Sequence, residues 1–237
     1  MTPVTSPWGV STPEAEAERP SSHQQRSYSA MTNMATPILR PIVASNIALL
    51  SQKLALMELL VSKGGRDKAS EQFQTSCKYC GGATIGQHYR HSMDHIELAA
   101  LVASNANQLA LGARKKEGEL HYDLRVRGGT LENDFGMSRQ RILDVMAAFE
   151  SLRDDAGEEL CSLPVEAYFN LSADSGEEIA LSSTVGRELG FVLHHAIHHL
   201  AMVRIICLNT IGIEECELPS GFGRAPSTLL FDNAQKP

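Results

Sequence analysis

The sequence carries no excess of basic charge. Lysine and arginine number 21 against 28 aspartate and glutamate residues, which gives a formal net charge of −7. The pI is about 5.7. General nucleic-acid binding needs a basic face on the protein. This charge balance therefore argues against nucleic-acid binding, and we expect no nucleic-acid partner.

Two further absences bear on the cellular setting. No run of eighteen apolar residues is free of charge, and the chain does not start with a basic segment followed by an apolar one. We therefore expect neither a transmembrane helix nor a secretory signal. The five cysteines form an odd and scattered set, which does not suit a disulfide framework. A reducing, cytoplasmic location without membrane contact is the prediction.

The length and composition suit one folded domain preceded by a tail. The chain has 237 residues, of which 43 % are hydrophobic, enough for a full core. Residues 1–35 are rich in proline, serine, threonine, glutamate and glutamine and show no apolar periodicity. The prediction is a disordered tail over 1–35 and one domain over 36–237.

The most informative segment is Arg187–Arg204, which contains four of the nine histidines. It has no proline and is apolar on every side, so it is predicted to be a buried helix. His195 and His199 lie about one turn apart on one face, the spacing at which a helix offers two imidazoles to one metal ion. His194 and His198 form a second such pair. The alternative is that one or two are core histidines bonded to backbone carbonyls.

A second helix, Thr84 to about Gly112, is predicted to present imidazoles to the same core. Its first residues, with Thr84 followed by Gln87, fit a capping box. Three histidines then recur at intervals of three and four, and so share one apolar-flanked face: His88, His91 and His95.

The remaining elements complete an all-α fold. The periodicity predicts a first helix from Pro37 or Pro41 to Val61, ended by Gly64-Gly65, and a third helix over Ser138–Ala156. Residues 163–183 indicate a β-hairpin between helices three and four, and Tyr122–Val126 indicates a short extended piece. The fourth helix is expected to be capped near Ser183 or Thr184 and to continue to about Asn209, and the tail Leu218–Leu229 is expected to be irregular. Together these elements predict a four-helix bundle, a fold that builds metal sites from inward side chains.

Two of these segments resemble the DinB-like metalloprotein superfamily. They are Thr84-Ile-Gly-Gln-His-Tyr-Arg-His91 and the His195-Ala-Ile-His-His199 pair. Members of that superfamily are four-helix bundles with one histidine ligand on helix two and two on the last helix. The resemblance covers about residues 38–210 and implies a divalent-metal site at His91, His195 and His199.

The resemblance also bears on chemistry. Characterised members include thiol-dependent transferases and isomerases, and domains of sulfoxide synthases, and members often dimerise. Many carry Arg-Gly-Gln after the last ligand, where this chain has Leu200-Ala-Met202. We expect a metal-dependent transferase or hydrolase acting on a small molecule, with a low-molecular-weight thiol as one substrate class. The alternative is a non-catalytic metal- or ligand-binding bundle, and a homodimer is left open.

Several side chains are assigned roles at this site. Three imidazoles leave a coordination position open, as in catalytic zinc sites, although nickel, iron and manganese also accept imidazole. His88 is a further candidate ligand or an orienting donor, and His198 is a candidate proton shuttle. Glu188 is a candidate general base, with a salt bridge to Arg187 or Arg204 as the alternative.

Two other groups lie outside the helices. Arg125 and Arg127 are predicted to clamp a carboxylate or phosphate of the substrate, or else to pair with Asp123 and hold the loop. Cys77 and Cys80 form a C-x-x-C pair, which together with the histidines of the second helix could make a closed zinc site. Loop thiols without a role are the preferred interpretation.

Overall fold

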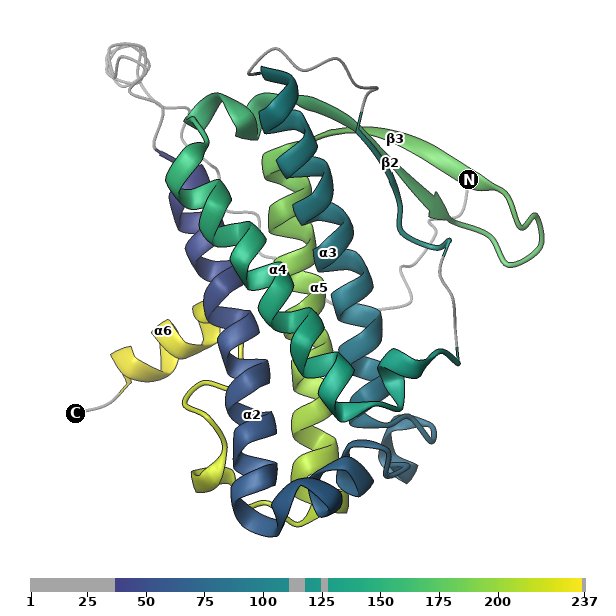
Figure 1. The fold of residues 1–237 in the computed structure, drawn as a ribbon, viewed down its shortest axis with the longest axis vertical. Coiled ribbons are helices and arrows are strands. Elements are labelled where there is room, and N and C mark those ends of the chain that lie inside the picture. Colours follow the sequence, from purple (N-terminus) through teal and green to yellow (C-terminus); the bar gives the residue numbers. More distant parts are fainter. Residues whose placement is uncertain (1–36, 111–117, 125–127, 236–237) are drawn as a thin grey trace, which may run out of the picture. The chain divides into compact units, whose positions relative to one another are not determined.

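The computed structural model describes residues 37–110, 118–124 and 128–235 (Figure 1). Within them the protein is mostly helical, with a small three-stranded sheet. The tail predicted over 1–35 lies outside the described residues. The helices are α2 (Leu39–Phe73), α3 (Ile85–Ala110), α4 (Phe135–Asp155), α5 (Val185–Ile206) and α6 (Pro226–Ala234).

Polar side chains fix where three of these helices begin. The hydroxyl of Thr84 accepts a hydrogen bond from the N–H of Gln87 at 3.1 Å, and the Gln87 amide oxygen accepts from the N–H of Thr84 at 3.2 Å. The predicted capping box is therefore present at the start of α3. Thr184 caps α5. Asp134 caps α4, which begins at Phe135, three residues before the predicted start at Ser138.

The first helix is longer than predicted. Gly64-Gly65 was expected to end it, but the chain only kinks at Gly65, where φ is 77° and ψ is 175°, and helix resumes up to Phe73. Side-chain packing beyond the kink accounts for the continuation. Phe73 is fully buried, with its ring 5.6 Å from that of Tyr89 and 5.5 Å from that of Phe135.

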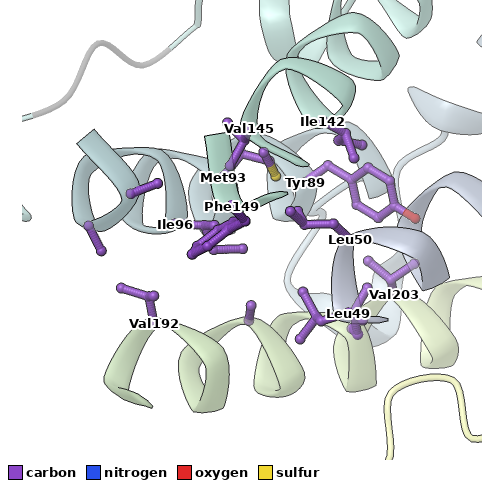
Figure 2. Close-up of a cluster of buried hydrophobic side chains, with 14 of the residues drawn as sticks. Leu49, Leu50, Tyr89, Met93, Ile96, Ile142, Val145, Phe149, Val192 and Val203 are labelled. Atoms are coloured by element: carbon purple, nitrogen blue, oxygen red, sulfur yellow. The ribbon is translucent and has the colours of Figure 1, made fainter. Parts of the chain in front are cut away.

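Four long helices enclose the hydrophobic core. The most extensive contacts join α3 to α5 and α2 to α4, and further contacts join α3 to α4 and α2 to α5. Figure 2 shows side chains from all four helices pointing into the same space, Phe149 of α4 and Val192 of α5 among them. Apolar residues recur at intervals of three and four in the third helix, and of these Ile142, Val145, Phe149 and Leu152 are buried and Met146 is half-buried. Apolar periodicity thus located the core correctly.

The predicted hairpin is present and belongs to a three-stranded sheet. Strand β2 (Pro164–Asn170) pairs antiparallel with β3 (Glu178–Thr184), and β1 (Glu119–His121) pairs parallel with β2. The extended piece predicted over Tyr122–Val126 therefore lies earlier in the chain. Tyr122 leaves the strand because its ring and hydroxyl are buried against α3 and α5.

The end of the chain is more regular than expected. α5 continues as a π-helical turn over Cys207–Ile211 and stops at Gly212, where φ is 78°. α6 follows further on, with Pro226 in its first turn. The intervening chain packs directly on α5, because a Cβ at Gly223 would lie 2.6 Å from the carbonyl oxygen of Leu200. The expectation of an irregular segment was therefore wrong over α6.

Two helices are long and apolar enough, by length and composition alone, to cross a membrane: Leu39–Phe73 and Val185–Ile211. Buried core helices of globular proteins meet the same criterion, and both segments contribute to the core described above. The expected absence of membrane contact stays a prediction.

Candidate metal centre

Three of the predicted ligands come together between α3 and α5. His195 Nε2 lies 3.2 Å from His91 Nε2 and 3.2 Å from His199 Nε2. Each of the three histidines offers one ring nitrogen, and these nitrogens all lie within 4.8 Å of one another. The helix spacing of His195 and His199 supplies one side of the site, and α3 supplies the other.

The spacing of these nitrogens suits a shared cation. Zinc–imidazole bonds of 2.0–2.1 Å in tetrahedral geometry place two ligand nitrogens roughly 3.3 Å apart. Two neutral imidazole nitrogens that face each other with lone pairs repel unless a proton or a cation lies between them. The arrangement is therefore one that a divalent metal ion would satisfy.

Burial keeps the imidazoles of His199 and His88 neutral. His199 is 9 % exposed. Burial, and then the neighbouring histidines, lower its pKa to about 2. Burial is also the main cause that lowers the pKa of His88 to about 4, with contributions from His198 and Lys53. A neutral imidazole keeps the lone pair that a metal ion needs, so no proton has to be displaced from these rings at neutral pH.

His88 lies behind the ligand group rather than within it. Its Nδ1 is 2.9 Å from Nδ1 of His199, which is the ring nitrogen opposite the one that faces His195. An imidazole bound to a metal through Nε2 carries its proton on Nδ1, and that proton needs an acceptor. His88 is placed to be this acceptor.

A wall of aromatic rings covers one side of the imidazoles, and the site assignments made from the sequence did not include it. His95 is 5 % exposed, and its ring centroid lies 4.8 Å from that of His91 and 4.3 Å from that of His195. Tyr122 stacks on His95 at 4.8 Å with an interplanar angle of 13°. Phe191 stacks on His195 at 5.8 Å. The recurrence of His95 one turn after His91 was the available signal, whereas Tyr122 comes from a distant segment.

Glu188 is buried and fully engaged. It is 1 % exposed, and its carboxylate accepts hydrogen bonds from Tyr122 Oη at 2.7 Å, Ser183 Oγ at 2.5 Å and Arg187 Nη1 at 2.6 Å. The Arg187 ion pair is the alternative that the sequence had left open. Through Tyr122 the carboxylate also holds the aromatic wall in place.

The other predicted side chains are more peripheral. His198 is exposed, with its ring centroid 5.3 Å from that of His199. Arg125 and Arg127 lie outside the described residues. Cys77 and Cys80 do not belong to the group of close ligand atoms around His91, so the described residues lend no support to a closed zinc site there.

A cleft of about 500 Å³ opens beside the aromatic wall. Tyr122 is one of its lining residues, and so is Leu124, the residue immediately before Arg125. Its arginines are already paired: Arg90 with Asp94 at 2.8 Å, and Arg141 with the same carboxylate at 3.0 Å. The cleft combines leucine side chains with these ion pairs, as small-molecule sites commonly do.

The chain has limited similarity to known proteins. It is 33 % identical over 110 residues to a protein named FK506-binding protein 5 from Rhizopus delemar. The matched stretch is 46 % of this chain and 26 % of that protein, so the chain spans about a quarter of the length of the curated relative. No protein-family model matches the sequence, and no solved structure matches it significantly.

Proposed function

We propose that this protein is a DinB-like four-helix bundle that binds one divalent metal ion, with zinc the first expectation, through His91, His195 and His199. The observation that carries the proposal is the convergence of three Nε2 atoms, with His195 Nε2 3.2 Å from each of the other two. Four long helices packed around one core, with the ligands on α3 and α5, support the bundle.

The proposed activity is a metal-dependent transfer or hydrolysis on a small molecule. A divalent ion held by three imidazoles would lower the pKa of a bound thiol or water towards neutrality. The leucine-lined cleft beside Tyr122 is the proposed entry for the substrate. Leu124 lines this cleft, and Arg125 and Arg127, the proposed clamp for a carboxylate or phosphate, come one and three residues after it in the chain.

The chain's own residues divide the remaining work. His88 holds the Nδ1 side of His199 and so fixes the direction of its ligand nitrogen. His198 is exposed next to His199 and is the proposed proton carrier between the site and solvent. Glu188 already accepts three hydrogen bonds, which favours holding Tyr122 over acting as a general base.

The competing function is metal binding without catalysis. Its specific support is the aromatic wall, because His95, Tyr122 and Phe191 cover one side of the imidazoles and restrict approach from that side. A site closed in this way would bind metal for stability or storage. Whether small thiols alter the coordination of the bound metal distinguishes the two functions.

The first experiment measures metal content by elemental mass spectrometry on protein purified without a histidine tag. The test variant is His195→Ala/His199→Ala, and the control is His194→Ala/His198→Ala, the second i, i+4 pair on the same helix, whose members are exposed. We expect about one equivalent of metal in the native protein and the control, and its loss in the test variant.

A second measurement covers the case in which the variant folds poorly. Adding Zn²⁺ to metal-free native protein is expected to raise the melting temperature, since a ligand at 1,000 times its Kd stabilises by about 4 kcal/mol. Absence of metal in the purified protein, together with an unchanged melting temperature on adding Zn²⁺, Ni²⁺ or Mn²⁺, would contradict the proposal.

A further inference from the structure

The loop between α2 and α3 brings two thiols together. Cys77-Lys-Tyr-Cys80 forms a 3₁₀ turn in which the N–H of Cys80 donates to the carbonyl oxygen of Cys77 at 3.1 Å. The Cys80 thiol donates to the carbonyl oxygen of Met202 at 3.8 Å. Such a turn holds the Cα atoms of its first and fourth residues within 7 Å, and disulfides span 4.4–6.8 Å between Cα atoms. The backbone is therefore already suited to a Cys77–Cys80 bond.

The rest of the loop leaves this turn free to close. Gly81 and Gly82 follow it with φ values of 61° and 86°, a conformation that glycine adopts without strain. The N–H of Gly82 donates to the same carbonyl of Cys77 at 2.9 Å. These backbone bonds lie within the loop, so rotation of the two cysteine side chains does not break them. Rotation of the Cys80 side chain would give up only its thiol bond to the Met202 carbonyl.

The two sulfurs differ in access and in hydrogen bonding. Cys77 is fully buried, and Thr210 Oγ1 donates to its Sγ at 3.1 Å, whereas Cys80 is half-buried. Burial alone raises the pKa of Cys77, but hydrogen bonds, from Thr210 first, hold that pKa below the usual value. Burial and then the Cys77 sulfur raise the pKa of Cys80 to about 11. Cys77 is therefore the first of the pair to lose its proton.

We infer that Cys77 and Cys80 form a thiol–disulfide exchange site whose substrate is a low-molecular-weight disulfide. This site is separate from the proposed metal centre and does not depend on it. The more accessible Cys80 sulfur attacks one sulfur of the disulfide while its proton passes to the Cys77 thiolate, and one thiolate leaves. That thiolate takes the proton back from Cys77, whose sulfur then attacks Cys80 and releases the second thiolate. Two cysteines are oxidised to one disulfide, and the substrate is reduced to two thiols.

The other cysteines provide an internal comparison. Cys161 and Cys207 are buried, and burial raises the pKa of both, that of Cys207 to about 12. Cys216 is exposed. We expect the buried pair to resist exchange, because the reagent does not reach their sulfurs and burial keeps both thiols protonated. Cys216 is expected to form at most a mixed disulfide with the reagent.

The test uses the full-length chain carrying Cys216→Ser, equilibrated without oxygen in oxidised and reduced glutathione at a series of ratios. After acid quenching, alkylation and peptide mass spectrometry identify which thiols have reacted. We expect a Cys77–Cys80 disulfide to become the main form as the ratio becomes more oxidising. Two outcomes would overturn the inference: both thiols remaining alkylatable at the most oxidising ratio, or a bond from Cys77 to Cys207 instead.

Two variants test the order of the steps. With Cys77→Ser the reaction should stop at a glutathione mixed disulfide on Cys80, because the resolving sulfur is missing. This mixed disulfide should form more slowly than in the native chain, because the thiolate that takes the Cys80 proton is missing too, so the variant is followed to equilibrium. An unmodified Cys80 in this variant contradicts the assigned order. Thr210→Val should move the pH midpoint of the exchange rate upwards and slow exchange at pH 7 several-fold, by about tenfold per unit of pKa. Thr228→Val, on an exposed threonine of α6, is the control. An unchanged midpoint in Thr210→Val contradicts activation of Cys77 by that hydroxyl.

Discussion

Two groups of basic side chains contact helix α3 inside the protein, and they differ in their partners. The imidazoles of His91, His195 and His199 face one another across α3 and α5. Lys53 of α2 is fully buried, with its Nζ donating to Ser92 Oγ at 2.6 Å and lying 4.3 Å from the centroid of the Tyr89 ring. Among its described contacts Lys53 has no carboxylate.

Burial lowers the pKa in both groups, but the consequence for the protein differs. It lowers the pKa of His199 to about 2, and together with the charge of Arg141 it lowers the pKa of Lys53 to about 7. A neutral imidazole still offers a lone pair to a metal ion, so burial of His199 is compatible with the proposed metal site. The protonated amine, by contrast, has one hydroxyl and one aromatic face to replace water. Burial therefore suits the proposed ligand and costs stability at Lys53.

The largest expected effect comes from removing the amine. Lys53→Met keeps most of the side-chain volume. It is expected to raise the free energy of unfolding at pH 7 by on the order of 4 kcal/mol, because it removes the amine whose pKa burial lowers from 10.5 to about 7. Between pH 7 and 10.5 the unfolded chain binds the Lys53 proton and the folded one does not. Native stability should therefore rise with pH in this window, and the variant should lose that dependence.

Urea unfolding at pH 7 and pH 9 measures this difference. Lys68→Met, at an exposed lysine of the same helix, is the control and should change stability by less than about 0.5 kcal/mol. If Lys53→Met is less stable than the native protein at both pH values, the buried amine stabilises the fold instead of destabilising it. The comparison with the imidazoles would then fail.

Glu188 is a buried charged group that, unlike Lys53, has several hydrogen-bond partners, so removing a partner should destabilise the protein. Tyr122→Phe removes the hydrogen bond from Tyr122 Oη to Glu188, and Glu188→Gln weakens it. Each variant should lower the free energy of unfolding by about 1–3 kcal/mol. Combined, they should cost less than the sum, which a double-mutant cycle by urea unfolding measures. Tyr168→Phe is the control, because its hydroxyl donates to the exposed Glu166. Equal losses in Tyr122→Phe and Tyr168→Phe would remove any special role for the buried pair.

The smallest effect sharpens the description of the imidazole group. His88→Ala is expected to weaken metal binding by about 10- to 100-fold while leaving the stoichiometry at one, because it removes the acceptor on His199 Nδ1. His198→Ala, at the exposed neighbour, should leave the affinity unchanged. Competition titration with a chromophoric chelator compares the two variants. If His88→Ala instead abolishes binding, His88 is itself a ligand, the role that the sequence had left open.

Local features of the chain were predictable where local physics decides them. The i, i+4 histidine pair, the capping residues Thr84 and Thr184, and the hairpin at residues 163–183 all follow from periodicity and turn chemistry. Each depends on residues within one or two helical turns or on adjacent strands. That is why the four long helices and their core-facing residues were anticipated, whereas the short helix α6 was not. The convergence of His91 with the His195 pair was implied by the resemblance to the DinB-like superfamily.

Other features depended on segments far apart in the sequence. The helix continues past Gly65 because Phe73 packs on Tyr89 and Phe135, which periodicity within α2 does not reveal. Parallel pairing of β1 with β2 places Glu119 opposite Glu166, and the bond from Tyr122 to Glu188 spans 66 positions. The sequence by itself determined which faces are apolar and where imidazoles recur. Only the tertiary structure decided which buried polar groups found partners, because those partners come from other elements.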